Sequence, residues 1–263
     1  MTIKRHLPNA VTLCNLLCGC LAIVFALKGV FYAAFIFILF GALFDFCDGL
    51  IARVLSAYSE IGKELDSLSD LVTFGVAPAV MGVEFIIYCI GYNWLCYIPL
   101  IIPICAALRL AKFNLDNSQS VTFLGLPTPA SGILFSAMVL YLKLYLSSYN
   151  MLFFELGTIS RNSVSVGLII FIAIVISAMM VSSIPMFSLK LKSFAYNENK
   201  LRYRFLAITL IELIVIFALY DFFTCGVGFT KKGAMMIFAF ALFILLLTYI
   251  IYNILIDLLC RKK

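Results

Sequence analysis

Histidine and charged residues are both scarce in this sequence. Among 263 residues there is one histidine, His6, and only 12% of the residues are charged. A catalytic site built on histidine acid–base chemistry, or a zinc site with several histidines, is therefore nearly excluded. Because 64% of the residues are hydrophobic and the mean hydropathy is +1.12, too little polar surface remains for a soluble globule. We expect an all-α, polytopic membrane helical bundle.

Closely paired cysteines are also lacking. The nine cysteines include no C-x-x-C spacing, and most of them lie inside apolar runs, where they act as small hydrophobic residues. Cys14, Cys18 and Cys20 have no second cluster in the sequence with which to form a metal site. The net charge of +6 does not indicate a nucleic-acid partner, because the basic residues lie between the apolar runs.

Long apolar runs predict about eight transmembrane helices. They lie at about residues 8–28, 31–55, 62–91, 94–110, 130–146, 163–184, 205–222 and 233–259. The first is expected to be an uncleaved span, and Pro78 should bend the third in its middle. Residues 147–162 should form an outer loop. We expect one integral-membrane domain, 1–263, with a catalytic core at about 1–186 and a C-terminal helical pair at about 205–259.

Basic residues are unevenly divided between the two ends of these predicted helices. Eight spans place both termini on one side, and that side carries fourteen of the nineteen Lys and Arg residues. The positive-inside rule assigns this side to the cytoplasm. We therefore expect an integral protein of the cell (inner) membrane, with its active site at the cytoplasmic face.

Two pairs of aspartates lie where the second predicted helix ends and the third begins. Asp45 and Asp48 are three residues apart, and Asp66 and Asp70 are four apart, so each pair projects from one face of its helix. A carboxylate deep in an apolar helix costs about 2.5–3.5 kcal/mol on insertion scales, and a bound cation would offset that cost. Such oxygen ligands suit Mg²⁺ or Mn²⁺.

Small residues and one cation lie between the two aspartate pairs. Gly49 and Gly62 allow a ligand to approach the backbone closely, and Ala52 is small. Arg53 supplies a fixed positive charge, although an interfacial anchor would have the same position. Together with the aspartates, these residues indicate a site that handles phosphate groups.

The aspartates and these residues form the pattern D-x-x-D-G-x-x-A-R-x8-G-x3-D-x3-D. In every fixed position the sequence resembles the CDP-alcohol phosphotransferase family of membrane enzymes. The sequence is most similar to one branch of this family, the membrane-integral phosphatidylserine synthases (CDP-diacylglycerol–serine O-phosphatidyltransferases). Four short segments carry this similarity. These are PNAVTLCNLLCG (8–19), LDSLSDLVTFGVAPA (65–79), LRLAKFN (108–114) and GLPTPA (125–130). The resemblance covers roughly residues 1–130.

The resemblance implies a phosphatidyl transfer from CDP-diacylglycerol to the hydroxyl of L-serine, which gives phosphatidylserine and CMP. It implies that Asp45, Asp48 and Asp66 hold the pyrophosphate and Mg²⁺ or Mn²⁺, with two ions as the expected number. Asp70 is the implied general base and a further metal ligand. A homodimer surrounded by membrane lipid is also implied.

Binding residues for the two substrates complete these expectations. CDP-diacylglycerol would be bound by Asn9, Thr12, Gly49, Ala52, Arg53 and Gly62, and the acceptor by Asn15, Arg109 and Lys112. Arg109 and Lys112 end the fourth predicted helix at the same membrane face as the aspartates. A pocket for the serine carboxylate would need a cation there. These two residues could equally be interfacial anchors. The polar stripe formed by Asn9, Thr12 and Asn15 could instead serve hydrogen bonds between helices.

Other functions compete with this interpretation. The nearest is a member of the same family that uses glycerol 3-phosphate or an inositol acceptor. Against it, position 15, where glycerophosphate-using relatives often carry a basic residue, is Asn. A divalent-cation transporter would need acids along an ion path, but predicted spans four to six contain no carboxylate. A purely structural membrane protein leaves the aspartate pattern unexplained.

Overall fold

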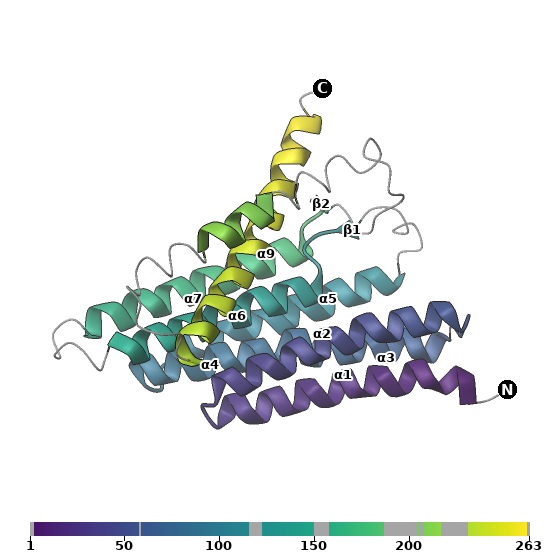
Figure 1. Ribbon diagram of the computed structural model, residues 1–263, viewed down its shortest axis with the longest axis horizontal. Coiled ribbons are helices and arrows are strands. Elements are labelled where there is room, and N and C mark those ends of the chain that lie inside the picture. The colour runs from purple at the N-terminus through teal and green to yellow at the C-terminus, as the bar shows by residue number, and fades with distance from the viewer. Residues whose placement is uncertain are drawn as a thin grey trace.

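A computed structural model of the chain confirms the all-α membrane bundle. It describes residues 3–57, 59–115, 123–149, 158–186, 205, 208–216 and 231–261. Within these ranges seven helices are long and apolar enough to cross a membrane. Most of them run side by side, whereas the C-terminal helix crosses the others obliquely (Figure 1). The seventh predicted span, at about 205–222, lies partly outside the described residues and is helical at 208–216.

The helix ends lie close to the predicted ones. The elements are α1 (Ile3–Leu27), α2 (Phe31–Val54), α3 (Glu60–Asp70), the π-helical segment η1 (Leu71–Val76), α4 (Ala77–Ile90), the 3₁₀-helical segment η2 (Trp94–Leu100), α5 (Ile101–Leu115), β1 (Phe123–Leu124), α6 (Thr128–Tyr149), α7 (Thr158–Val181), β2 (Pro185–Met186) and α9 (Lys231–Arg261). The prediction of a loop over all of 147–162 is wrong, because α6 continues to Tyr149 and α7 begins at Thr158. Helical backbone can extend past the apolar core into the interface, where polar side chains are solvated.

The third span is an α-helix with a π-helical interruption. At its start the side chain of Ser59 caps α3 by accepting a hydrogen bond from the Gly62 N–H at 3.0 Å. Within η1 the turn widens, and the N–H of Ala77 donates to the carbonyl of Val72, five residues back. Pro78, which has no N–H to donate, lies directly after η1 in the first turn of α4. The structure thus has a π-helical segment that ends two residues before Pro78, and the bend expected at Pro78 remains a prediction.

Helix α6 lies directly against η1. A Cβ atom at Gly132 would come within 2.6 Å of the Phe74 carbonyl oxygen, so only glycine permits this approach of the two backbones. The close contact brings the first turn of α6, with Thr128, to the same cavity as Asp70. The packing of α6 thus decides which residues face the end of α3.

A two-stranded antiparallel ribbon, which the hydrophobic pattern does not predict, joins two connections at one end of the bundle. In this ribbon Phe123 pairs with Met186 and Leu124 with Pro185. The following residue, Gly125, has a φ of 72°, a conformation that favours glycine. Its N–H donates to the Ile184 carbonyl at 2.9 Å. The connection before α6 is therefore fixed to the end of α7.

The C-terminal helix α9 packs on the bundle through aromatic side chains. The rings of Phe240 and Tyr141 have centroids 4.9 Å apart, and those of Phe238 and Phe35 are 6.4 Å apart. Contacts of this kind add about 0.5–1.5 kcal/mol beyond the buried area. α9 thus shares the core of the other helices, and the division into a catalytic core and a C-terminal pair remains a prediction.

Candidate active site

Three aspartates from two helices meet in the structure. Asp45 and Asp48 on α2 and Asp66 on α3 each place one carboxylate oxygen within 4.8 Å of the other two. Asp48 is buried, whereas Asp45 and Asp66 are partly exposed. We call these three residues the aspartate cluster. Like charges this close repel one another strongly in a medium of low dielectric constant, so a bound cation would stabilise the cluster.

The ligand chemistry of the aspartate cluster fits a divalent metal ion. All the offered ligand atoms are carboxylate oxygens, which Mg²⁺ and Mn²⁺ prefer. The Oδ1 atom of Asp66 is buried and has no hydrogen-bond donor among the described residues. A buried carboxylate oxygen without a donor is costly, and a metal ligand has no need of one. Asp45, Asp48 and Asp66 are therefore the residues that could hold the metal.

Helix α1 supports the cluster from one side. The hydroxyl of Thr12 donates to Oδ2 of Asp48 at 2.7 Å, and both side chains are buried. Such a bond fixes the orientation of a carboxylate and leaves its second oxygen for a cation. The predicted contact of Thr12 with CDP-diacylglycerol remains a prediction; in the structure its hydroxyl contacts Asp48.

Asp70 lies beside the aspartate cluster and outside it. Its side chain is 7% exposed, and its Oδ1 accepts a hydrogen bond from Nδ2 of Asn15 at 3.2 Å. The hydroxyl of Thr73 donates to the backbone carbonyl of Asn15 at 3.0 Å and so ties α1 to η1. Asp70 is thus held in one orientation next to the cluster, while its predicted role as a metal ligand remains untested.

Two cavities meet at the aspartate cluster, and Asp48 and Asp66 line both of them. One, of about 220 Å³, is lined by Asn9, Thr12, Gly49, Ala52 and Gly62 together with Asp48, Asp66 and other residues. We call it the α1 cavity. It contains five of the six residues predicted to bind CDP-diacylglycerol. The sixth, Arg53, lines the other cavity, and Lys63 lines both.

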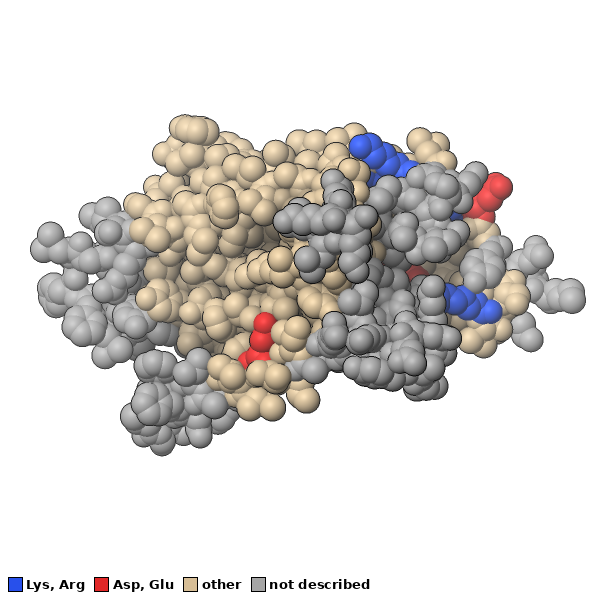
Figure 2. Space-filling model, turned by 90° about the horizontal axis from the view of Figure 1, so that it is seen from above, with Lys and Arg blue, Asp and Glu red and all other residues tan. Residues whose placement is uncertain are grey.

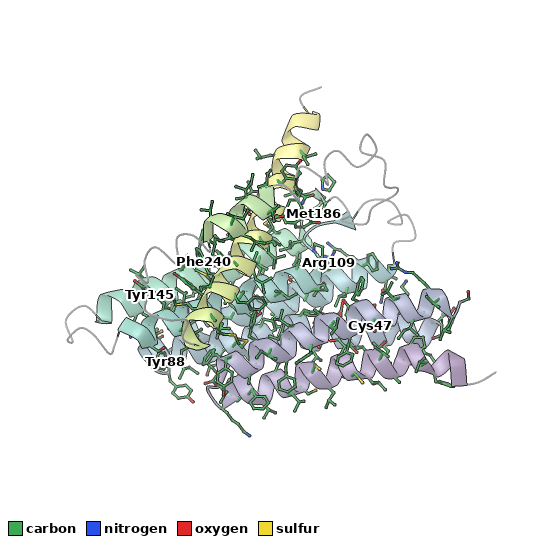
Figure 3. All side chains as sticks on the ribbon, in the orientation of Figure 1. Cys47, Tyr88, Arg109, Tyr145, Met186 and Phe240 are labelled. Carbon is green, nitrogen blue, oxygen red and sulfur yellow. The ribbon has the colours of Figure 1, made fainter. Side chains whose placement is uncertain are left out.

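The second cavity lies on the α5 and α6 side and has a volume of about 450 Å³. It is lined by all four predicted aspartates and by Arg109 and Thr128. We call it the central cavity. Arg109 is partly buried, and its Nη1 donates to the hydroxyl of Thr128 at 3.2 Å. Figure 3 shows Arg109 toward the same end of the bundle as Met186, with Tyr88 and Tyr145 toward the opposite end.

The other two predicted acceptor residues lie elsewhere. Asn15 is fully buried and lines neither cavity; its contact is with Asp70. Lys112 is exposed and lines a third, smaller cavity together with Arg109. The structure therefore brings one of the three, Arg109, to the central cavity.

Sequence reasoning missed a polar network at the rim of the central cavity. The ammonium of Lys63 donates to the backbone carbonyl of Asn114 at 2.8 Å, and the amide of Asn114 donates to Ser67 at 3.0 Å. These bonds link α3 to α5. The segment LRLAKFN, which ends at Asn114, was the sequence feature that could have indicated this network. The sequence alone does not show that Asn114 faces Lys63 and Ser67.

Comparison with known proteins agrees with this geometry. The family model of the CDP-alcohol phosphatidyltransferases matches residues 5–160, which include every residue of the aspartate cluster. The chain belongs to the CDP-alcohol phosphatidyltransferase family. It is thus a phosphatidyltransferase of phospholipid biosynthesis, as its sequence pattern predicts.

Several relatives of this phosphatidyltransferase carry names that mention serine. A CDP-diacylglycerol–serine O-phosphatidyltransferase of Bacillus subtilis is 42% identical over 130 residues, which are 49% of this chain and 72% of that protein. A protein of the same name from Mycobacterium leprae is 38% identical over 134 residues, only 44% of its length. An archaetidylserine synthase of Methanothermobacter thermautotrophicus is 33% identical over 184 residues, 68% of either chain.

Metal affinity provides a test of the aspartate cluster. Because a carboxamide binds a hard cation far more weakly than a carboxylate, Asp48→Asn should weaken Mn²⁺ binding to the purified protein at least about 100-fold. Thr12→Val, which removes only the supporting hydroxyl, should weaken it about 10-fold. Electron paramagnetic resonance of free Mn²⁺ measures both. Glu60→Gln, at an exposed acid outside the cluster, is the matched control, and equal affinities of all three variants would contradict the assignment.

Proposed function

We propose that this phosphatidyltransferase transfers the phosphatidyl group of CDP-diacylglycerol to the hydroxyl of L-serine and releases CMP. The observation that carries the proposal is the cavity that all four aspartates line together with Arg109. An anionic pyrophosphate and an acceptor with a carboxylate would both find their counter-charges there. The names of the relatives from Bacillus subtilis and Methanothermobacter thermautotrophicus support serine as the acceptor.

The residues divide between the two substrates. Asn9, Gly49, Ala52 and Gly62 line the α1 cavity and bind the nucleotide end of CDP-diacylglycerol, since small residues leave room for it. Asp45, Asp48 and Asp66 hold Mg²⁺ or Mn²⁺, with two ions as the expected number. When bound, the metal neutralises charge on the pyrophosphate and on the leaving CMP.

Asp70 is the proposed general base for the acceptor. It lines the central cavity and is held by Asn15 through one oxygen, which leaves the second oxygen for the serine hydroxyl. As the bond from the serine oxygen to phosphorus forms, the bond from phosphorus to the CMP oxygen breaks and the hydroxyl proton passes to Asp70. We propose that Asn15 acts through Asp70 as a positioning residue.

The acceptor assignment is tested by competition. Membranes that contain the protein are supplied with CDP-diacylglycerol and equal concentrations of labelled L-serine, glycerol 3-phosphate and inositol. We expect the label to enter phosphatidylserine, because Arg109 can pair with the carboxylate of serine. Label in a glycerophosphate or inositol lipid instead would assign the enzyme to a different acceptor within the same family.

The role of Asp70 is tested by separating binding from turnover. Asp70→Asn should retain CDP-diacylglycerol binding, because Asp45, Asp48 and Asp66 remain, and should lose roughly 10²-fold or more in kcat, the scale for a missing base. Binding and turnover are measured on the same purified protein. A parallel loss of both would make Asp70 mainly a ligand, and turnover near that of the wild type would remove it from the mechanism.

We propose that the aspartate cluster faces the cytoplasm, where CDP-linked donors and serine are available. Exposed Arg53 and Lys63 line the central cavity together with the cluster, and the positive-inside rule favours the cytoplasm for such residues. In the view of Figure 2, Lys and Arg side chains gather toward one end of the molecule. The implied homodimer remains a prediction.

Thiol labelling tests this orientation. Single cysteines are placed at Ser56, next to the end of α2, and at Lys28, between α1 and α2 at the opposite end; both positions are exposed. In a background without other reactive cysteines, Lys28→Cys should react with an impermeant reagent in intact cells, whereas Ser56→Cys should react only after permeabilisation. The reverse pattern would overturn the orientation.

A further inference from the structure

A third cavity adjoins the central cavity through Arg109. It has a volume of about 150 Å³ and is lined by Arg109, Lys112 and Phe113 of α5 and by Met180, Val181, Ser182 and Ser183 at the end of α7. Arg109 and Phe113 line the central cavity as well. We call it the α7 cavity. Its α7 residues lie beyond residues 5–160, to which the family model applies.

The α5 wall of this cavity is cationic. Arg109 and Lys112 are one helical turn apart on α5, so their side chains project from the same face. The guanidinium of Arg109 is held by Thr128 through Nη1 at 3.2 Å, and Nε of Arg109 is buried without a hydrogen-bond acceptor among the described residues. This wall suits a carboxylate, which can accept from both cations.

The opposite wall is the C-terminal end of α7, which ends at Val181. The last carbonyls of a helix lack partners within it and carry a partial negative charge. That of Met179 accepts from the Leu126 N–H at 3.0 Å, which leaves the later carbonyls of the helix end for a ligand. The hydroxyl of Ser182 donates to the carbonyl of Met179 at 2.8 Å, so its oxygen still has lone pairs with which to accept a hydrogen bond. This wall suits an ammonium group.

We infer that the α7 cavity binds the zwitterionic part of an amino-acid acceptor. The carboxylate lies against Arg109 and Lys112, and the ammonium lies against Ser182 and the carbonyl end of α7. Because Arg109 lines both cavities, an acceptor held in this way can extend its hydroxyl toward Asp70. The inference rests on the proposed function and deepens it, since it names Lys112 and Ser182 as residues that select the acceptor.

The same arrangement disfavours the rival acceptors. A phosphate ester would fit the cationic wall but would place its remaining negative charge near the carbonyl end of α7, where anions are destabilised. An uncharged polyol would leave both cations without a counter-charge. An α-amino acid with a hydroxyl meets both walls with opposite charges.

Two analogues of L-serine test the two walls separately. Ethanolamine lacks the carboxylate, and 3-hydroxypropanoate lacks the ammonium. Each is measured as a competitor of labelled L-serine with purified full-length protein, so an inhibition constant is obtained whether or not the analogue reacts. For the wild type we expect both to compete at least about 10-fold more weakly than unlabelled L-serine, since each loses one charged contact. Equal competition by all three would overturn the inference.

Two variants assign the contacts to residues. Ser182→Ala should raise KM for L-serine and the inhibition constant of ethanolamine about 10-fold and leave that of 3-hydroxypropanoate unchanged. Lys112→Gln should weaken the binding of L-serine and of 3-hydroxypropanoate by a similar factor and leave the inhibition constant of ethanolamine unchanged. Ser177→Ala, a buried serine of α7 that does not line this cavity, is the control and should change none of these constants.

The outcomes separate this inference from the proposed function. Inhibition constants do not depend on the fraction of active enzyme. Partial unfolding of a variant therefore cannot produce the expected result, in which each variant weakens the binding of one analogue and not of the other. L-serine could be the acceptor while both variants weaken the binding of the two analogues equally, or change the binding of neither. In that case the α7 cavity is not the zwitterion site. If L-serine is not the acceptor at all, the proposed function fails, and this inference fails with it.

Discussion

The structure depends on placing several carboxylates together inside an apolar protein. An isolated carboxylate in the membrane interior costs about 2.5–3.5 kcal/mol on insertion scales, and Asp45, Asp48 and Asp66 lie within 4.8 Å of one another. Their mutual repulsion opposes bringing these parts of α2 and α3 together, although both helices pack on α1. A bound cation would change the sign of this interaction and so would hold the two helices together at this point.

The neighbouring helices are arranged around this junction. α1 supplies Thr12 to Asp48 and Asn15 to Asp70, so the first helix of the chain orients both acidic pairs. α5 and α6 close the opposite side with Arg109 and Thr128. The aspartate cluster therefore lies where two cavities meet, one lined mainly by α1 and small residues and the other also lined by Arg53 and Arg109.

The membrane spans and the aspartate cluster could be predicted from the sequence, because each depends on residues that are close together along the chain. Apolar runs gave the spans, and the spacing of Asp45, Asp48 and Asp66 along two helices predicted that they share a site. The contacts of Asn15 and Lys112 could not be predicted, since they depend on how α1 and α7 pack against distant helices. The β1–β2 ribbon has only two residues in each strand, which is too short for a hydrophobic period to reveal it.

The π-helical segment Leu71–Val76 sets the rotational phase between the two halves of the third span. A π-type turn contains one residue more than an α-type turn, and one residue turns an α-helix by about 100°. Asp66 and Asp70 therefore face the cavity while the residues after Pro78 keep their own buried face toward the core. In an uninterrupted α-helix these two faces would be offset from each other by about 100° more or less than they are, so the π-helical segment fits both of them to their separate surroundings.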